Sequence, residues 1–380
     1  MNNSIKQSEE FIPNNNIKMK KKNLNYMFPM KCINSNDSNC YLDSFIQCLI
    51  HINEFANYFL NEYPNISSLL KQKNKKGDFS ESFYNIIKDA CENNSLSNNE
   101  SKTFKKKSLR NIYKNQKYIN LENFKNILFS QKNFGLDKNN CKNYILSIFQ
   151  IMHEELNYLE EQKLELNSNQ ILFDKFSKFN SFNNIYNMNN LSIISKLFYG
   201  TIEEITKCNN CQTTTYNFQK FSFISFNTTD YAKQLFNIND GFEDYTKTEI
   251  IRENDGLYCP KCKKVFEAES YRKIIEPPKK LLINIEYNED DRLKPIKVDF
   301  KDKIDISKYT DFSLGLLIEY ELICICTYIN DFKNNYNNYF TYCKDKRTDE
   351  WYYFNEQKSE KINLEDIYLR NPYILLYEKI

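Results

Sequence analysis

Residues 39–49 of the chain read Asn-Cys-Tyr-Leu-Asp-Ser-Phe-Ile-Gln-Cys-Leu, a stretch that predicts a helix with a cysteine at its start. Apolar residues recur through Ile50 at the spacing of a helix that buries one face. Asn39 is a residue type that caps helix N-termini. Cys40 would then meet the free N–H groups and the positive end of the helix dipole, which favour a nucleophilic thiolate. An inert thiol near the cap is the alternative.

A cysteine nucleophile needs a proton acceptor, and histidine is the usual one. The chain holds two histidines, His51 and His153. His51 comes eleven residues after Cys40 on the same predicted helix. At about 1.5 Å of rise per residue it lies about 16 Å away and cannot reach the thiol. His153 stands within a second predicted helix, between an apolar and an acidic residue, where a structural role is the expectation.

Two Cys-x-x-Cys pairs form the clearest metal-binding pattern, Cys208 with Cys211 and Cys259 with Cys262. Each pair places two thiolates on one turn, and structural zinc takes four such ligands in a tetrahedron. No histidine or carboxylate belongs to the set, so it predicts a closed structural zinc site and not a catalytic one. Four unrelated thiols, or a redox-active pair, are the alternatives.

The composition predicts a largely globular protein of near-neutral charge. The 380 residues are 41% hydrophobic and 15% aromatic, and 52 Lys and Arg stand against 50 Asp and Glu. This balance argues against a nucleic-acid partner bound by bulk charge. The basic clusters Lys20–Lys22 and Lys105–Lys107 lie in polar surroundings and are interpreted as solvated.

The sequence has no apolar run near the length of a membrane span and no signal-like N-terminus. We therefore expect no membrane partner and an intracellular location, in the cytoplasm or the nucleus. In such a reducing compartment the 12 cysteines are expected to be thiols or metal ligands.

Helical patterns come first along the chain and strand patterns later, which predicts an α+β fold. Residues 1–26 are polar and predict a disordered leader. A second helix is predicted over residues 144–156, and strands over Phe221–Phe226, Lys280–Tyr287 and Tyr320–Tyr328. In the last strand, alternation would place Ile323 and Ile325 on one face. The opposite face would carry Tyr320, Leu322, Cys324, Cys326 and Tyr328.

Several motifs, in order, resemble those of the ubiquitin-specific protease family. Residues 39–49 resemble its cysteine box, N-T-C-Y-x-N-S-x-L-Q-x-L, and residues 140–156 its D-A-x-E-F-L…L-H-x-E-L helix. The segments 198–211 and 258–262 are similar to the two limbs of its zinc-binding fingers, and 277–283 to L-P-x-x-L-x-I. The last motifs, Y-x-L-x-A-V-V-x-H, G-H-Y-x-x-Y, W-Y-x-F-D/N and A-Y-x-L-F-Y, resemble 320–328, 337–342, 351–355 and 372–377.

The resemblance covers about residues 28–380 and implies the papain-like cysteine protease fold of this family. That fold is α+β, with a helical thumb, a β-rich palm and zinc-bearing β fingers. The implied boundaries are a domain at 27–380, a thumb at 27–165 with an insertion near 93–116, an insertion at 166–190, and palm and fingers at 191–380.

The resemblance also implies the roles of site residues. Cys40 takes the nucleophile position, and Asn355 takes the third triad position, which the family fills with Asp or Asn. Asn338 stands where the family has its general-base histidine, and Ser35 stands where it has an oxyanion-stabilising asparagine. Tyr339 belongs to the channel for the ubiquitin tail. Because an amide does not titrate, loss of the base would slow catalysis by about 10²–10⁴.

The sequence thus predicts a zinc-bearing domain that recognises ubiquitin or ubiquitinated proteins, with impaired catalysis, as a scaffold or a subunit beside partner proteins. An active cysteine deubiquitinase with a non-standard base is one alternative, which a proton acceptor near Cys40 would favour. An interaction module that no longer binds ubiquitin is the other. A blocked channel between the Cys40 helix and the Tyr339 strand would favour it.

Overall fold

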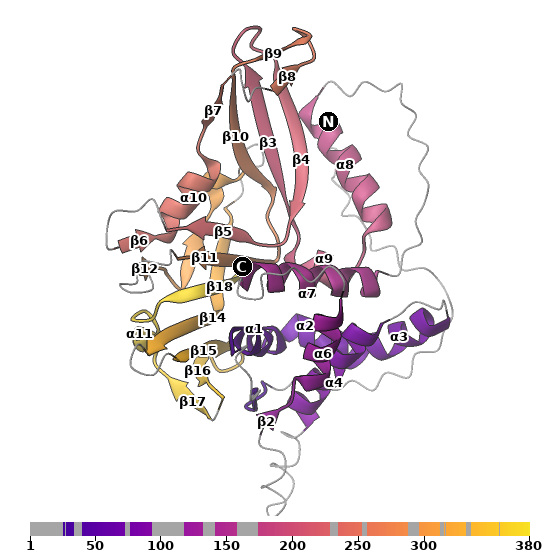
Figure 1. The fold of residues 1–380 in the computed structure, drawn as a ribbon, viewed down its shortest axis with the longest axis vertical. Helices are drawn as coiled ribbons and strands as arrows, with labels where there is room; N and C mark the ends of the chain where they lie inside the picture. Colours follow the sequence, from indigo (N-terminus) through magenta and orange to yellow (C-terminus); the bar gives the residue numbers. More distant parts are fainter. Residues whose placement is uncertain are drawn as a thin grey trace, which may run out of the picture.

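The computed structural model describes residues 26, 28–33, 40–72, 77–92, 118–131, 141–157, 174–228, 235–252, 257–287, 296–311, 315, 317–331, 336–356 and 358–380. Helices gather at one end, a large sheet lies beside them, and a narrower sheet projects away from both (Figure 1). Residues 1–25, Ser35, Asn39 and the predicted insertion at 93–116 lie outside the described residues. Tyr26, the last residue of the predicted leader, packs against the core.

The helical end is built around α1, whose described side chains, residues 41–50, are all buried. It begins at Cys40, as predicted, and the second predicted helix is α7, which contains His153. A π-helical turn, Tyr58–Glu62, joins α2 to α3, and Pro64, which has no N–H to donate, follows at once. The helix bounds are α1 Cys40–Ile50, α2 Asn53–Asn57, α3 Tyr63–Gln72, α4 Asp78–Glu92, α6 Glu122–Ser130 and α7 Cys141–Leu156.

The large sheet runs in the order β17-β16-β15-β14-β18-β11-β5, and β13 also pairs with β14. Its neighbours are antiparallel except β5 and β11, which are parallel. The strands predicted over 280–287 and 320–328 are β11 and β14. The bounds are β5 Ile224–Asn227, β11 Lys280–Glu286, β13 Lys303–Asp305, β14 Glu319–Asp331, β15 Tyr336–Asp345, β16 Glu350–Phe354, β17 Ser359–Ile362 and β18 Pro372–Lys379.

The two faces predicted for β14 are wrong. The register with β18 shifts between Leu322 and Cys324, so the strand carries one extra residue there. A one-residue shift turns every later side chain to the opposite face. Tyr320 and Leu322 therefore face one core, whereas Cys324 and Cys326 face the other, which lies beneath the helices.

The narrower sheet has the order β4-β3-β10-β7 and carries the β8–β9 hairpin at its far tip (Figure 1). The strand predicted over 221–226 is wrong, because β4 ends at Phe221 and β5 begins at Ile224. The chain leaves one sheet and enters the other between them. The bounds are β3 Gly200–Cys208, β4 Thr214–Phe221, β7 Glu249–Ile251, β8 Leu257–Cys259, β9 Lys264–Phe266 and β10 Ala268–Glu276.

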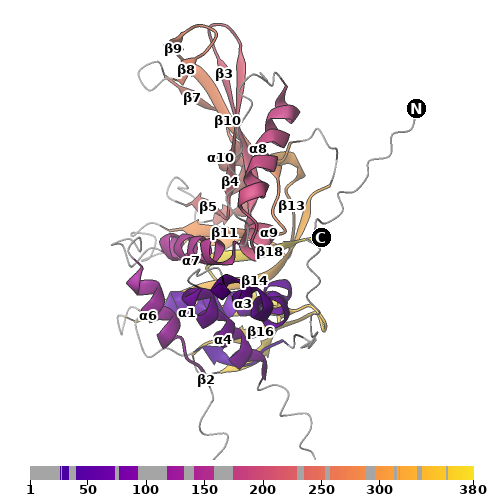
Figure 2. The same cartoon turned by 90° about the vertical axis from the view of Figure 1, so that its right-hand side faces the viewer.

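Helix α8, Lys175–Asn189, forms part of the predicted insertion at 166–190 and lies along β4 (Figure 1 and Figure 2). Lys175 Nζ lies 2.6 Å from Glu203 Oε2 and 2.9 Å from Asp311 Oδ2, which ties the helix to the sheet. The remaining elements are β1 Cys32–Ile33, β2 Tyr118–Ile119, α9 Ile193–Phe198, β6 Leu235–Asn237, α10 Ile238–Thr246, β12 Lys297–Asp299, a 3-10 turn Ser307–Tyr309 and α11 Leu364–Ile367.

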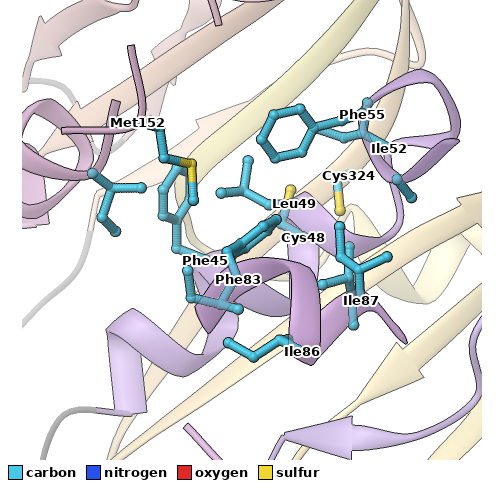
Figure 3. Close-up of a cluster of buried hydrophobic side chains, with 14 of the residues drawn as sticks. Phe45, Cys48, Leu49, Ile52, Phe55, Phe83, Ile86, Ile87, Met152 and Cys324 are labelled. Carbon is cyan, nitrogen blue, oxygen red and sulfur yellow. The ribbon is translucent and has the colours of Figure 1, made fainter. Parts of the chain in front are cut away.

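Two apolar cores lie on opposite faces of the large sheet. Along β11, Leu282 belongs to the core beneath the helices, and its neighbours Leu281 and Ile283 belong to the other. The first core is shown in Figure 3, where Cys48 of α1 and Cys324 of β14 lie among Phe and Ile side chains. Among the described residues, no helix combines the length and apolar character that crossing a membrane requires.

Gly200 marks the start of β3, where the chain passes from the helices to the narrower sheet. A Cβ atom added there would lie 2.6 Å from the Phe221 ring and 2.8 Å from the backbone oxygen of Glu276. The close approach of backbone to backbone explains why this position requires glycine.

We predict that Gly200→Ala lowers the free energy of unfolding by about 1–3 kcal/mol, because the Glu276 carbonyl cannot move without disturbing β10. Denaturant unfolding measures the change. Gly77→Ala is the matched control, since a Cβ there meets nothing within 4 Å, and its effect should stay below about 1 kcal/mol. Equal effects for the two variants would contradict the packing argument.

Candidate functional site

A hollow lies between the first turns of α1, strand β15 and the turn after β16. It places Asp43, on the turn that follows Cys40, near Tyr339 and Asn355. Asn338 precedes Tyr339 in β15 and pairs in register with Ile329 of β14. The side chains of Cys40 and Asn338 lie outside the described part of the structure. The lining residues are Ile33, Asp43, Ser44, Gln47, Tyr339, Thr341, Phe354, Asn355 and Glu356.

Hydrogen bonds hold the first turns of α1 against three strands. The backbone oxygen of Ser44 accepts from Thr341 Oγ1 at 2.9 Å and from Cys326 Sγ at 3.4 Å. The Tyr373 hydroxyl lies in hydrogen-bond contact with Ser44 Oγ and donates to the backbone oxygen of Tyr41 at 3.1 Å. The start of α1 therefore has one position relative to β14, β15 and β18.

Tyrosine rings continue this contact between helices and sheet. The Tyr339 ring lies 5.8 Å from that of Tyr41 and 5.6 Å from that of Tyr373, both edge to face. The Tyr41 ring also meets Tyr144 of α7 at 4.8 Å. Such edge-to-face pairs add to the burial of the rings themselves. Tyr339, predicted for the tail channel, thus lies where the helical end meets the large sheet.

A buried ion pair lies beside the hollow. Lys125 Nζ of α6 lies 2.8 Å from Asp43 Oδ1, and the two side chains are 4% and 5% exposed. Sequence reasoning did not single out either residue, because Lys125 is separated from α1 by a long stretch of chain. The pair fixes the orientation of the Asp43 carboxylate and places the Lys125 ammonium group beside it.

Asn355 is bound into its own turn. Its Nδ2 donates to the Tyr353 hydroxyl at 3.0 Å, and its Oδ1 accepts from the backbone N–H of Lys358 at 2.7 Å. Both ends of the amide are therefore engaged locally, which holds the side chain at the edge of the hollow.

His51 lies just beyond the C-terminal end of α1, far from Cys40 along the helix, as predicted. Its ring contacts two carbonyl oxygens, Gln47 O at 2.6 Å and Pro29 O at 2.8 Å. Burial lowers its pKa to about 4, although both contacts favour the charged ring. At neutral pH the ring is thus uncharged and donates only one of the two hydrogen bonds.

Gln47 joins the same helix to the segment 28–33. Its Oε1 accepts from the Ile33 N–H at 2.9 Å and its Nε2 donates to the Lys31 oxygen at 3.1 Å. The glutamine and His51 together hold the chain that leads towards Cys40.

His153 has a structural role in α7, as predicted. Its Nδ1 contacts Ser192 Oγ at 2.7 Å, and its Nε2 contacts Asn190 Oδ1 at 3.4 Å. Ser192 is the N-cap of α9, accepts from the Ser195 N–H and is 1% exposed. The contacts of His153 with Ser192 and Asn190 have the composition of a hydrolytic triad. However, the Ser192 hydroxyl caps α9 and is buried, so a substrate cannot reach it. Burial also lowers the pKa of His153.

The four cysteines predicted as ligands converge at the tip of the narrower sheet. The Sγ atoms of Cys208, Cys211, Cys259 and Cys262 all lie within 4.8 Å of one another. A tetrahedral zinc shell with Zn–S near 2.3 Å needs sulfurs about 3.8 Å apart, so the donor set fits one ion. Hydrogen bonds from the Thr213 side chain and backbone lower the pKa of Cys211 to about 6, whereas, against the hydrogen bond from Asn210, the neighbouring thiols raise the pKa of Cys262 to about 12, as expected where four thiols crowd together.

The two knuckles share their backbone geometry. The residues that follow each second cysteine, Gln212 and Lys263, have φ of 56° and 55°. Their N–H groups bond the carbonyl oxygens of Cys208 and Cys259, both at 2.8 Å. Residues other than glycine rarely adopt this left-handed backbone conformation. Its presence at the same position of both turns indicates that the two turns have the same shape and direct their thiols towards one point.

A family model described as ubiquitin carboxyl-terminal hydrolase matches residues 33–377. Ubiquitin carboxyl-terminal hydrolase 5 of Saccharomyces cerevisiae is 22% identical over 368 residues, which cover 90% of this chain and 44% of the yeast protein. A probable ubiquitin carboxyl-terminal hydrolase of Acanthamoeba polyphaga mimivirus is 26% identical over 49% of this chain and 41% of its own length. The chain spans less than half the length of either relative.

Solved structures with a similar fold include yeast SAGA DUBm with an Sgf73 mutant. It has a TM-score of 0.62 and 17% identity, and the match covers 94% of this chain and 70% of the other. The SAGA DUB module of Ubp8, Sgf11, Sus1 and Sgf73 bound to monoubiquitin has a TM-score of 0.60 and 18% identity, over 92% and 69% of the two chains. At these identities the likeness concerns the fold.

The architecture is the α+β fold of ubiquitin-specific proteases, with a helical thumb, a β palm and β fingers. The chain belongs to the ubiquitin carboxyl-terminal hydrolase family, as a catalytic domain of the ubiquitin-specific protease type. The expected fold class and family are therefore confirmed.

We predict that Lys125→Met lowers the free energy of unfolding by about 3–5 kcal/mol, because it removes the cation that faces the buried Asp43 carboxylate. The double variant Asp43→Asn with Lys125→Met should recover most of the loss, since no uncompensated charge remains. Denaturant unfolding of both single variants and the double variant measures the coupling. Additive losses would contradict a direct ionic interaction between the two side chains.

Proposed function

We propose that this domain binds ubiquitin or ubiquitinated proteins and hydrolyses them very slowly or not at all, acting as a scaffold or as a subunit beside partner proteins. The observation that carries the proposal is the position of the two histidines. His51 and His153 are the only histidines of the chain, and neither is among the residues that line the hollow beside α1.

The proposed site residues are Cys40 as nucleophile position, Asn338 as base position, Asn355 as third triad position and Ser35 as the altered oxyanion position. Support comes from the placement of Cys40 at the head of α1 and of Asn355 on the hollow that Asp43 also lines. Thiol hydrolysis requires a base for the thiol and an acid for the leaving amine, and an asparagine amide supplies neither.

The other titratable group that α1 brings to the hollow, Asp43, is a poor substitute for the base. Its carboxylate lies 2.8 Å from Lys125 Nζ, and a neighbouring cation lowers carboxylate basicity. An ionised carboxylate also carries no proton to give to a departing amine. Asp43 therefore meets neither requirement of the reaction, and the other carboxylate that lines the hollow, Glu356, is the group that the alternative of an active enzyme with a non-standard base would call on.

Binding depends on different features from catalysis. A protein interface extends over a broad surface and does not require one proton acceptor, so recognition survives loss of a base. The solved neighbours support this choice of partner, because one of them is a module bound to monoubiquitin and contains further subunits. Tyr339, between α1 and β18, would line the channel that receives the ubiquitin tail.

We also propose zinc as the structural metal of the four-cysteine site. A dication neutralises thiolates that would otherwise repel one another, and the set leaves no open position for chemistry. Zinc would hold the β8–β9 hairpin to the end of β3, since the ligands Cys208 and Cys259 belong to those elements.

The proposed division of the domain is a thumb at 27–165 with an insertion near 93–116, an insertion at 166–190, and palm and fingers at 191–380. It is supported by the gathering of α1 to α7 at one end and by β3, which begins at Gly200. An intracellular location, in cytoplasm or nucleus, agrees with the four knuckle cysteines, which converge as a metal-ligand set of the kind found in reducing compartments.

We predict that the wild-type protein releases a fluorophore from a ubiquitin C-terminal amide no faster than its Cys40→Ala variant, while both bind ubiquitin in a titration. Without a general base the rate falls by about 10²–10⁴. Asn338→His should raise turnover above that of the wild type, and a ubiquitin probe with a vinyl warhead should then label Cys40.

Robust wild-type turnover that Cys40→Ala abolishes would instead establish an active deubiquitinase with a non-standard base. Absence of ubiquitin binding in a chain that is folded by circular dichroism would establish an interaction module that no longer recognises ubiquitin. Either result would overturn the proposal.

We predict one zinc per chain by elemental analysis and its loss in Cys259→Ser, with a lower unfolding midpoint. Metal binding to a folded site contributes directly to stability, so a chelator should produce the same shift in the wild type. Cys91→Ser is the matched control, because Cys91 lies in α4, away from the four ligands. Equal zinc content in the two variants would contradict the assignment.

A further inference from the structure

Four buried cysteines lie where α1 meets the large sheet, outside the proposed catalytic and zinc sites. Cys48 comes from α1, Cys324 and Cys326 from β14, and Cys343 from β15. Each is at most 1% exposed. Cys48 and Cys324 lie side by side (Figure 3), and Cys324 is the register partner of Cys343, so the thiols form a row between the helix and the sheet.

One pair in this row is closer than thiols normally approach. The sulfurs of Cys324 and Cys343 lie 2.8 Å apart, nearer than van der Waals contact and farther than a disulfide bond of about 2.05 Å. The two residues are direct register partners of the antiparallel pair β14 and β15. Opposite residues in such a pair have Cα atoms about 4.5 or 5.5 Å apart, and both values fall within the range that disulfides span.

The β14 bulge creates this arrangement. Without the register shift between Leu322 and Cys324, Cys324 would face the same side as Tyr320, in the other core. With it, Cys324 and Cys326 both point towards α1, and Figure 3 shows Cys324 beside Cys48.

A metal site is the less favoured interpretation of the row. Among the described residues, the only group of three or more ligand atoms that all lie near one another is that of the four knuckle cysteines. The row is therefore extended rather than clustered, and it offers a close pair of sulfurs instead of a coordination shell.

We propose that Cys324 and Cys343 are an oxidation site that forms a cross-strand disulfide when the protein meets a hydroperoxide. The Cys343 or Cys324 thiolate attacks one peroxide oxygen, which gives a sulfenic acid and water. The second thiol then displaces the sulfenic hydroxyl as water, and the S–S bond forms. Two thiols lose two protons and two electrons, and one hydrogen peroxide becomes two molecules of water.

The environment sets the rate of this reaction. Burial raises the pKa of Cys343 to about 12 and that of Cys324 well above its usual range, so little thiolate forms in the closed fold. Oxidation is therefore slow and passes through local opening of β14 and β15. The disulfide, once formed, joins β14 to β15, and β15 is the strand that contains Asn338 and Tyr339.

The disulfide would also reach α1. Cys48 lies beside Cys324 (Figure 3), and the backbone oxygen of Ser44, one helical turn earlier, accepts a hydrogen bond from Cys326 of the same strand. The oxidation state of the pair thus acts on the contact that positions the first turns of α1. This inference does not depend on the proposed ubiquitin binding, since it concerns the strands alone.

Peptide mapping tests the proposal on the zinc-loaded full chain. The protein is treated with hydrogen peroxide at neutral pH for many times the period in which the half-buried Cys91 reacts, then unfolded, alkylated and digested with trypsin without reduction. We expect fragments 309–333 and 334–344 joined, with a mass about 2 Da below their sum. The joined pair should be absent from Cys324→Ala and Cys343→Ala.

Cys326→Ala is the matched control, because Cys326 lies on the same strand, is equally buried and faces the same core. The joined fragments should persist in it. The oxidised wild type should unfold a few degrees higher than the reduced protein, and oxidised Cys343→Ala should show no such rise. Two results would overturn the proposal: alkylated, unjoined Cys324 and Cys343 after treatment, or a bond from Cys324 to Cys48.

Discussion

The contact between α1 and the large sheet is the interaction on which the rest of the structure depends. The helix is enclosed by the thumb helices on one side and by β14, β15 and β18 on the other, and its described side chains are all buried. Ser44 receives hydrogen bonds from two of these strands, and Tyr373 bonds the turn before it from the third. A residue at the head of α1 is therefore held relative to β15 by packing that involves nearly the whole domain.

Charges and polar groups at this contact are paired in ways that limit their chemistry. Asp43 faces Lys125, Asn355 is bound into its own turn, and His51 is buried at the far end of the helix. Each group contributes to holding a segment in place, and a buried polar group that is fully engaged stabilises one arrangement. The same engagement holds each of these three side chains in one orientation.

The bulge in β14 links sheet geometry to the helix contact. One extra residue turns two cysteines from the far core to the core beneath α1, where they meet a third on the helix and a fourth on β15. Bulges are found where a strand must redirect its side chains. Here the redirected side chains are thiols, so the same feature that completes the packing beneath α1 also brings oxidisable groups together.

Much of the architecture could be predicted from the sequence because the signals are local. The apolar spacing after Cys40 predicts α1, the order of helices and strands predicts an α+β fold, and the knuckle spacing predicts which four cysteines converge. The helical period and the geometry of a turn depend on a few neighbouring residues, so both can be predicted from the sequence without knowledge of the fold. The roles assigned to Cys40 and Asn338 come from the family resemblance and stay predictions.

Other features were decided by tertiary structure alone. The face of Cys324 depends on a bulge relative to β18, the partner of Asp43 comes from α6, and the break between β4 and β5 occurs where the chain changes sheets. Each depends on contacts between segments that are distant in sequence, for which residue periodicity carries no information. The sequence by itself determined which elements form and which residues could do chemistry, and packing decided which of those residues meet.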